Sequence, residues 1–165
     1  MNQDRPLSRR ALYATVFTSG MVTLAIELSA SRLLGSVFGT SNLIWANVIG
    51  LILLYLTAGY FIGGRLADRW PQPRTLYTIL IWAAFLCAMI PLAARPVLQA
   101  AASAVVAAEA GTAIGSFIVT ILLFAIPITL LGMVSPFAIR LAIVDAKDAG
   151  RVSGAIYAVS TLGSL

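Results

Sequence analysis

The residue best suited to chemistry in this sequence is Glu27, a carboxylate inside a long apolar run. Thr15, Ser19, Thr23, Glu27 and Ser31 recur every four residues. On a helix this spacing places them on one narrow, slowly rotating polar face. A carboxylate in such a setting could bind a cation or a proton, or it could make a structural hydrogen bond between helices. The sequence leaves both readings open.

Arg32 is the nearest opposite charge, but it is not the expected partner of Glu27. An offset of five residues places the two side chains about 140° apart around a helix. Both therefore need partners on other helices. We expect Asn47 and Tyr55, two turns apart in the next apolar segment, to be the substrate-binding candidates beside Glu27. A polar group on a helix outside this sequence is the alternative.

The composition excludes several kinds of active site. Histidine is absent, and Cys87 is the single cysteine. No histidine-based triad, disulfide framework or zinc site can be built from these residues. Neither a dinucleotide-binding nor a phosphate-binding glycine motif is present. We therefore expect no catalytic residue, metal or cofactor in this chain.

The densest group of charges is the segment GGRLADRWPQPR, which contains Gly64, Arg65, Asp68 and Arg69. Two prolines in it predict a tight turn after a helix end. One interpretation is topological, because basic residues gather beside helix ends on the cytoplasmic side. The other is a charge relay that holds this loop against another helix in one conformation and releases it in another, as an inner gate would.

Small residues and prolines indicate how the helices pack. Gly59 and Gly63 lie four residues apart, a spacing that permits close helix approach. We favour packing inside one bundle over dimerisation. Pro127 and Pro136 each remove a backbone donor, so they are expected to bend or end the helix that contains them.

The whole chain has 165 residues, of which 60% are hydrophobic and only 10% are charged. Such a chain is not a soluble globule, and apolar runs of about 20 residues need a bilayer. We predict an all-α polytopic transmembrane helix bundle. The four full spans are predicted at 11–34, 43–64, 75–94 and 113–136. An incomplete fifth span is predicted at 152–165, and a short external interfacial helix at 97–110.

The formal net charge of +5 is interpreted as topology rather than as nucleic-acid binding. With the N-terminus inside, nine basic residues lie on the cytoplasmic side, and only Arg32 and Arg95 lie toward the outside. A signal peptide cleaved near Ser29 to Ser31 is the less favoured alternative. We expect a multi-pass protein of the inner membrane. The nine are Arg5, Arg9, Arg10, Arg65, Arg69, Arg74, Arg140, Lys147 and Arg151.

Two family resemblances follow from these motifs. The pattern G-x-x-x-D-R from Gly64 resembles the loop between helices two and three of major facilitator superfamily transporters, where these residues help to gate the inward face. Four longer segments together resemble the membrane-spanning N-terminal region of bacterial spermidine synthase-like proteins. They are ELSASRLLGSVFGTSNLIW, GYFIGGRLADRWP, SPFAIRLAI and GRVSGAIYAVSTLGSL.

The second resemblance implies that a soluble aminopropyltransferase domain follows the helices in the same polypeptide. It also implies a polyamine as partner, alongside the lipid bilayer, and Glu27 is where a cation would be sought first. The helices would anchor the enzyme domain, bind or conduct a polyamine, or sense one. The alternatives are the N-terminal portion of a major facilitator-type secondary transporter, and a purely structural anchor.

Overall fold

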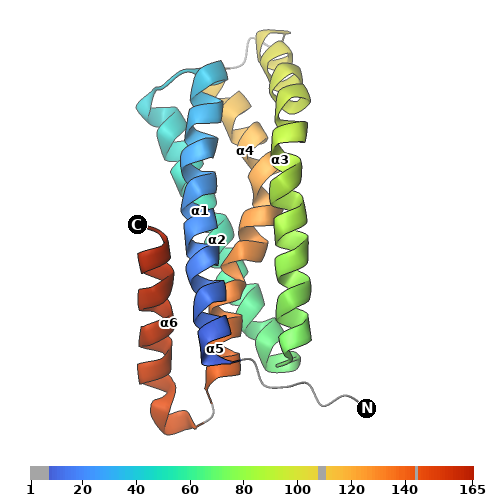
Figure 1. Cartoon of the computed structure of the whole chain (residues 1–165). Helices are drawn as coiled ribbons and strands as arrows, with labels where there is room; N and C mark the ends of the chain where they lie inside the picture. The colour runs from blue at the N-terminus through green and yellow to red at the C-terminus, as the bar shows by residue number, and fades with distance from the viewer. Residues whose placement is uncertain (1–7, 108–110, 144) are drawn as a thin grey trace.

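The computed structural model describes residues 8–107, 111–143 and 145–165, and these residues form helices joined by short connections, without a strand. Figure 1 shows the long helices α1 to α4 running alongside one another in alternating directions. α5 continues from α4, and α6 turns back to lie beside α1. The helices are α1 (Arg9–Phe38), α2 (Asn42–Arg69), α3 (Pro73–Ala107), α4 (Thr112–Gly132), α5 (Val134–Ala142), the 3-10 helix η1 (Ala146–Asp148) and α6 (Ala149–Gly163).

Four segments are long and apolar enough to cross a membrane, namely Arg9–Phe38, Asn42–Arg69, Pro73–Val106 and Thr112–Ala142. The all-helical expectation is confirmed, and these four segments contain the residues that the sequence predicts to span the membrane. α6 has 15 residues, fewer than the roughly 20 that a full crossing requires. In Figure 1 it ends about halfway along the bundle.

Local sequence signals explain where the helices begin and end. Ser8 and Ser41 cap α1 and α2, because each hydroxyl accepts a hydrogen bond from a backbone N–H three residues later, at 3.2 and 3.4 Å. α1 stops at Gly39, whose φ of 93° favours glycine. α3 begins at Pro73, a residue whose fixed φ suits the first helical position.

The predicted break before the external helix is wrong. α3 passes through Pro91 and Pro96 without interruption and continues to Ala107. Residues 97–107 are therefore the last turns of α3 rather than a separate helix, and residues 108–110 of that prediction lie outside the described part. Apolar helices tolerate proline when neighbouring groups satisfy the freed carbonyls, and the alanine-rich stretch that follows favours helix strongly.

The two prolines of the fourth span behave differently from each other. Pro127 lies within the continuous helix α4, whereas the helix is interrupted at Met133, three residues before Pro136. Proline at 136 cannot donate to the carbonyl of Gly132, and its ring crowds that carbonyl. The interruption between α4 and α5 therefore follows from Pro136, and Pro127 alone does not end its helix.

Glycines let three helices approach closely at the centre of the bundle. A Cβ added to Gly63 would lie 2.6 Å from Met133 Cα, and one added to Gly59 would lie 2.9 Å from Gly132 Cα. Gly59 and Gly63 therefore pack against the junction of α4 and α5 inside this bundle. The similar pair Gly150 and Gly154 on α6 faces open space.

Candidate functional site

Glu27 lies half-buried in a polar cleft between helices, which we call the Glu27 cleft. The cleft has a volume of about 140 Å³ and receives residues from α1, α2, α4, α5 and α6. Helices far apart in sequence thus contribute to one site. Its lining residues are Ser19, Gly20, Thr23, Leu24, Glu27, Leu56, Tyr60, Leu131, Gly132, Ser135, Ser160 and Ser164.

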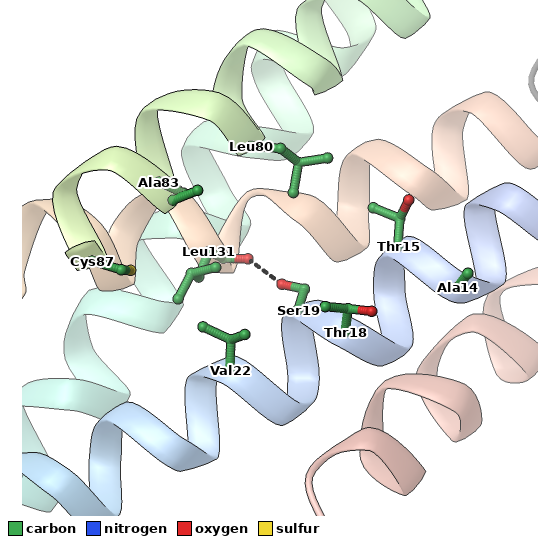
Figure 2. A pocket seen from close by; sticks show the side chains of 10 residues that line it. Ala14, Thr15, Thr18, Ser19, Val22, Leu80, Ala83, Cys87 and Leu131 are labelled. Atoms are coloured by element: carbon green, nitrogen blue, oxygen red, sulfur yellow. Dashed lines mark hydrogen bonds between the residues drawn. The ribbon is translucent and has the colours of Figure 1, made fainter.

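The polar stripe of α1 reaches the cleft over only part of its length. Each step of four residues rotates the face by about 40°, so a long stripe cannot follow one neighbour. Ser19 donates to the carbonyl of Leu131 at 3.5 Å, as Figure 2 shows, and Thr23 donates to the Ser19 carbonyl at 2.8 Å. Thr15 faces a different cavity, and the buried Ser31 hydroxyl has no hydrogen-bond partner among the described residues.

α6 completes the cleft because two glycines bring it close to α1. A Cβ on Gly20 would meet the Ser160 carbonyl, and a Cβ on Gly163 would meet the backbone of Phe17. This approach places Ser160 and Ser164 at the cleft, and the Ser164 hydroxyl donates to the Ser160 carbonyl at 3.1 Å. α6 is therefore part of the site and not only a connection.

The cleft is suited chemically to a cation. The described residues contain two ion pairs, Arg140 with Asp68 and Arg151 with Asp148, and neither involves Glu27. A single carboxylate surrounded by hydroxyl groups can accept hydrogen bonds from an ammonium group. The described residues hold no group of three potential metal-ligating side chains. The one carboxylate of the cleft can balance a single positive charge, such as that of an ammonium group.

The structure does not bring Asn47 and Tyr55 to Glu27. The Asn47 side-chain amide donates to the Ala113 carbonyl at 3.2 Å and to Ser116 Oγ at 3.3 Å, so it joins α2 to α4. The Tyr55 ring packs against the apolar core, and its buried hydroxyl has no hydrogen-bond partner among the described residues. Arg32 is exposed on α1 and, in the part of the chain that is described, takes no part in an ion pair.

Sequence reasoning missed Tyr60, Ser135 and Ser160 as neighbours of Glu27. Tyr60 lies on α2 beside Gly59, one helical turn before Gly63, and the close contact of those glycines with α4 sets its place. Ser160 depends on the contact of Gly163 with α1. The available signal was the presence of small residues three or four positions from these polar residues. That signal does not show which helix is the partner.

The charged segment after Gly63 is held by a contact between helices. Asp68, in the last turn of α2, accepts a hydrogen bond from Arg140 Nε of α5 at 3.2 Å. The neighbouring arginines do not pair with Asp68 in the described structure. Arg65 instead lies 4.1 Å over the Phe61 ring and Arg69 lies 4.9 Å over the Trp70 ring.

Gly64 of the same segment has open space around it. Its place in the G-x-x-x-D-R pattern is therefore not explained by a close contact within this chain. Of the residues predicted for a gate, the described structure connects only Asp68 to another helix.

Four helices long and apolar enough to cross a membrane, together with a polar cleft around one carboxylate, are typical of a multi-pass membrane protein. Comparisons of the chain with protein-family models, with curated proteins and with solved structures find no match.

Proposed function

We propose that this chain is the membrane domain of a spermidine synthase-like protein and that the Glu27 cleft binds a polyamine. In this proposal the N-terminus faces the cytoplasm and the helices lie in the inner membrane. A soluble aminopropyltransferase domain follows in the same polypeptide, and the bundle anchors it. The orientation is supported by the arginines Arg9, Arg69 and Arg140, which lie near the start of α1, the end of α2 and the end of α5, the end that would face the cytoplasm.

One observation carries the binding proposal: the carboxylate of Glu27 lies in a hydroxyl-lined cleft with no cationic side chain paired to it among the described residues. A carboxylate at membrane depth is costly unless it is paired or hydrated. An ammonium group would supply both the opposite charge and N–H donors. The hydroxyl oxygens of Tyr60, Ser135 and Ser160 could accept the remaining hydrogen bonds. The polyamine as a ligand class comes from the sequence resemblance.

The test is equilibrium binding of spermidine to the full-length protein in lipid nanodiscs. Glu27→Gln keeps the size of the side chain and removes its charge. We expect it to weaken binding about tenfold or more, because hydrogen bonds to charged groups contribute roughly 1.5–3 kcal/mol. Asp68→Asn is the matched control, since it removes a carboxylate outside the cleft and should leave the affinity unchanged. Equal affinity of wild type and Glu27→Gln would remove Glu27 from the site.

A second candidate function is the N-terminal portion of a facilitator-type secondary transporter. The ion pair between Asp68 and Arg140 favours it, because it joins the end of α2 to α5 where an inner gate would operate. Glu27 would then be a coupling or substrate residue. Polyamine flux into proteoliposomes distinguishes the two. A transporter loses rate with Asp68→Asn while retaining binding, whereas an anchoring domain gives no protein-dependent flux in either form.

A further inference from the structure

A second cavity lies between α1 and α3 and differs from the Glu27 cleft in being largely apolar. It has a volume of about 550 Å³ and is shown in Figure 2. Ala14, Thr18 and Val22 line it from α1, and Leu80 and Ala84 line it from α3. Ala83 and Ala84 on α3 have small side chains and leave space that larger side chains would fill. We call this cavity the α1–α3 groove.

The groove continues along α1. A neighbouring cavity of about 240 Å³ shares Val22 and Cys87 with it and extends to Ala30. The larger section runs along α1 from Ala14 to Val22, which is about 12 Å at the helical rise of 1.5 Å per residue. One leaflet of a bilayer has a hydrocarbon depth of about 15 Å, half of the full core. The larger section therefore matches the depth of a single leaflet.

The form and lining of the groove suit flexible hydrocarbon chains. Its larger section is lined mainly by apolar side chains and continues along α1 into the second section, past Val22 and Cys87.

Charge at one end of the groove indicates which lipid would fit. Arg10 precedes Ala14 by four residues, so it lies on the groove face of α1, one turn nearer the membrane surface. Its side chain is exposed. Arg74 is exposed in the first turn of α3 at the same end of the bundle. Neither takes part in an ion pair among the described residues. Basic residues beside a groove between membrane helices favour an anionic lipid headgroup.

We propose that the α1–α3 groove binds one anionic phospholipid, with an acyl chain along Val22 and Cys87 and the headgroup at Arg10. The groove borders the Glu27 cleft, with which it shares Ser19 and Leu131, but Glu27 does not line the groove. This site would fix the spacing of α1 and α3, which make little direct contact elsewhere. Ala84 lines only the groove and Glu27 lines only the cleft, so substitutions at these two residues test lipid binding and polyamine binding separately.

The test is native mass spectrometry of the full-length protein released from nanodiscs that contain equal amounts of phosphatidylglycerol and phosphatidylcholine. We expect one phosphatidylglycerol to remain bound. Ala84→Phe, which fills the groove, should abolish retention, and Arg10→Gln should lower the preference for the anionic lipid about fivefold, the contribution of one basic residue near a membrane surface.

Two matched controls separate the groove from general effects. Ala46→Phe adds the same side chain at an exposed alanine of α2 that lines neither section of the groove, and Arg32→Gln removes an exposed arginine at the opposite end of α1. Both should retain the lipid as wild type does. Equal loss in the controls and the groove variants, or retention in Ala84→Phe, would overturn the proposal. A dimer of this chain that dissociates on Ala84→Phe would also overturn it, because a second copy and not a lipid would then occupy the groove.

A measurement on the unchanged protein covers the case in which Ala84→Phe does not fold. Cys87 is the single cysteine of the sequence and lines both sections of the groove. Its alkylation by a lipid-soluble maleimide should be several-fold slower in nanodiscs of phosphatidylglycerol than in nanodiscs of phosphatidylcholine. Equal rates in the two lipids contradict binding of an anionic lipid at this place.

Discussion

Asp68 and Arg140 are 72 residues apart in the sequence and form an ion pair, with 3.2 Å between Asp68 Oδ1 and Arg140 Nε. The pair joins the last turn of α2 to the last turn of α5. Their side chains are 77% and 46% exposed, respectively, so water and salt screen the attraction. The pair therefore contributes little to holding the fold together.

This placement predicts a small effect on stability. We expect Asp68→Asn and Arg140→Gln each to lower the free energy of unfolding by less than about 1 kcal/mol, the usual range of exposed pairs. The double variant should cost no more than the larger single change, because the same contact is lost. Thermal unfolding in detergent at low and high salt measures this. A loss of several kcal/mol from either single change would show that the pair is structural.

The glycines of α2 give a sharper prediction, because neighbouring positions have opposite surroundings. A Cβ at Gly63 would lie 2.6 Å from Met133 Cα, which is backbone and cannot move aside, whereas Gly64 has nothing within 4 Å. Gly63→Ala should therefore destabilise the protein by about 1–3 kcal/mol through overpacking. Gly64→Ala should be neutral or should stabilise the helix by up to about 1 kcal/mol. Chemical denaturation of the two variants compares them, and similar values would contradict the close packing of α2 on the α4–α5 junction.

The position of α6 depends on Gly163 in the same way. A Cβ there would meet the carbonyl of Phe17, while Gly154 faces open space on the same helix. Gly163→Ala should push α6 from α1 and expose the connection around η1, so limited proteolysis near Lys147 should become several-fold faster. Gly154→Ala serves as the control and should be cleaved at the wild-type rate. Unchanged proteolysis in Gly163→Ala would mean that α6 is not held by this contact.

Asn47 has a structural role in this fold, and its substitution separates stability from binding. Its amide nitrogen donates to the Ala113 carbonyl and to Ser116 Oγ, joining α2 to α4. Asn47→Ala should cost about 1 kcal/mol of stability, and Asn47→Asp more, since a carboxylate cannot donate to a carbonyl. Neither should change spermidine affinity in folded protein. A loss of spermidine affinity similar to that of Glu27→Gln would show that Asn47 is part of the binding site.

The helices were predictable from the sequence to a larger extent than the site. Apolar runs and capping residues such as Ser41 act locally, so four candidate spans could be read from composition and spacing alone. The continuation of α3 through Pro96 could not be predicted in this way. The free-energy cost of a proline inside a helix depends on neighbouring groups that satisfy the freed carbonyl.

Only part of the Glu27 cleft could be predicted from the sequence, for a related reason. Glu27 can be recognised from the sequence as a carboxylate in an apolar run, but its neighbours depend on which helix faces it. Tyr60 and Tyr55 lie on the same helix five residues apart, and only contacts such as that of Gly59 with Gly132 decide which of them reaches Glu27. Such contacts between helices are not encoded in the periodicity of either one.

These two tyrosines provide the most direct test of the cleft. Tyr60 lines it together with Glu27, whereas the Tyr55 hydroxyl is buried in the core with no hydrogen-bond partner among the described residues. Tyr60→Phe should weaken spermidine binding about tenfold or more, because the hydroxyl would accept from a charged ammonium group and such hydrogen bonds contribute roughly 1.5–3 kcal/mol. Tyr55→Phe should leave binding unchanged and should stabilise the protein slightly, since it removes an unsatisfied buried hydroxyl. Binding isotherms and thermal unfolding of both variants in nanodiscs measure the contrast. If Tyr55→Phe weakened binding and Tyr60→Phe did not, α2 would have to present its other face to Glu27, and the cleft described here would not be the binding site.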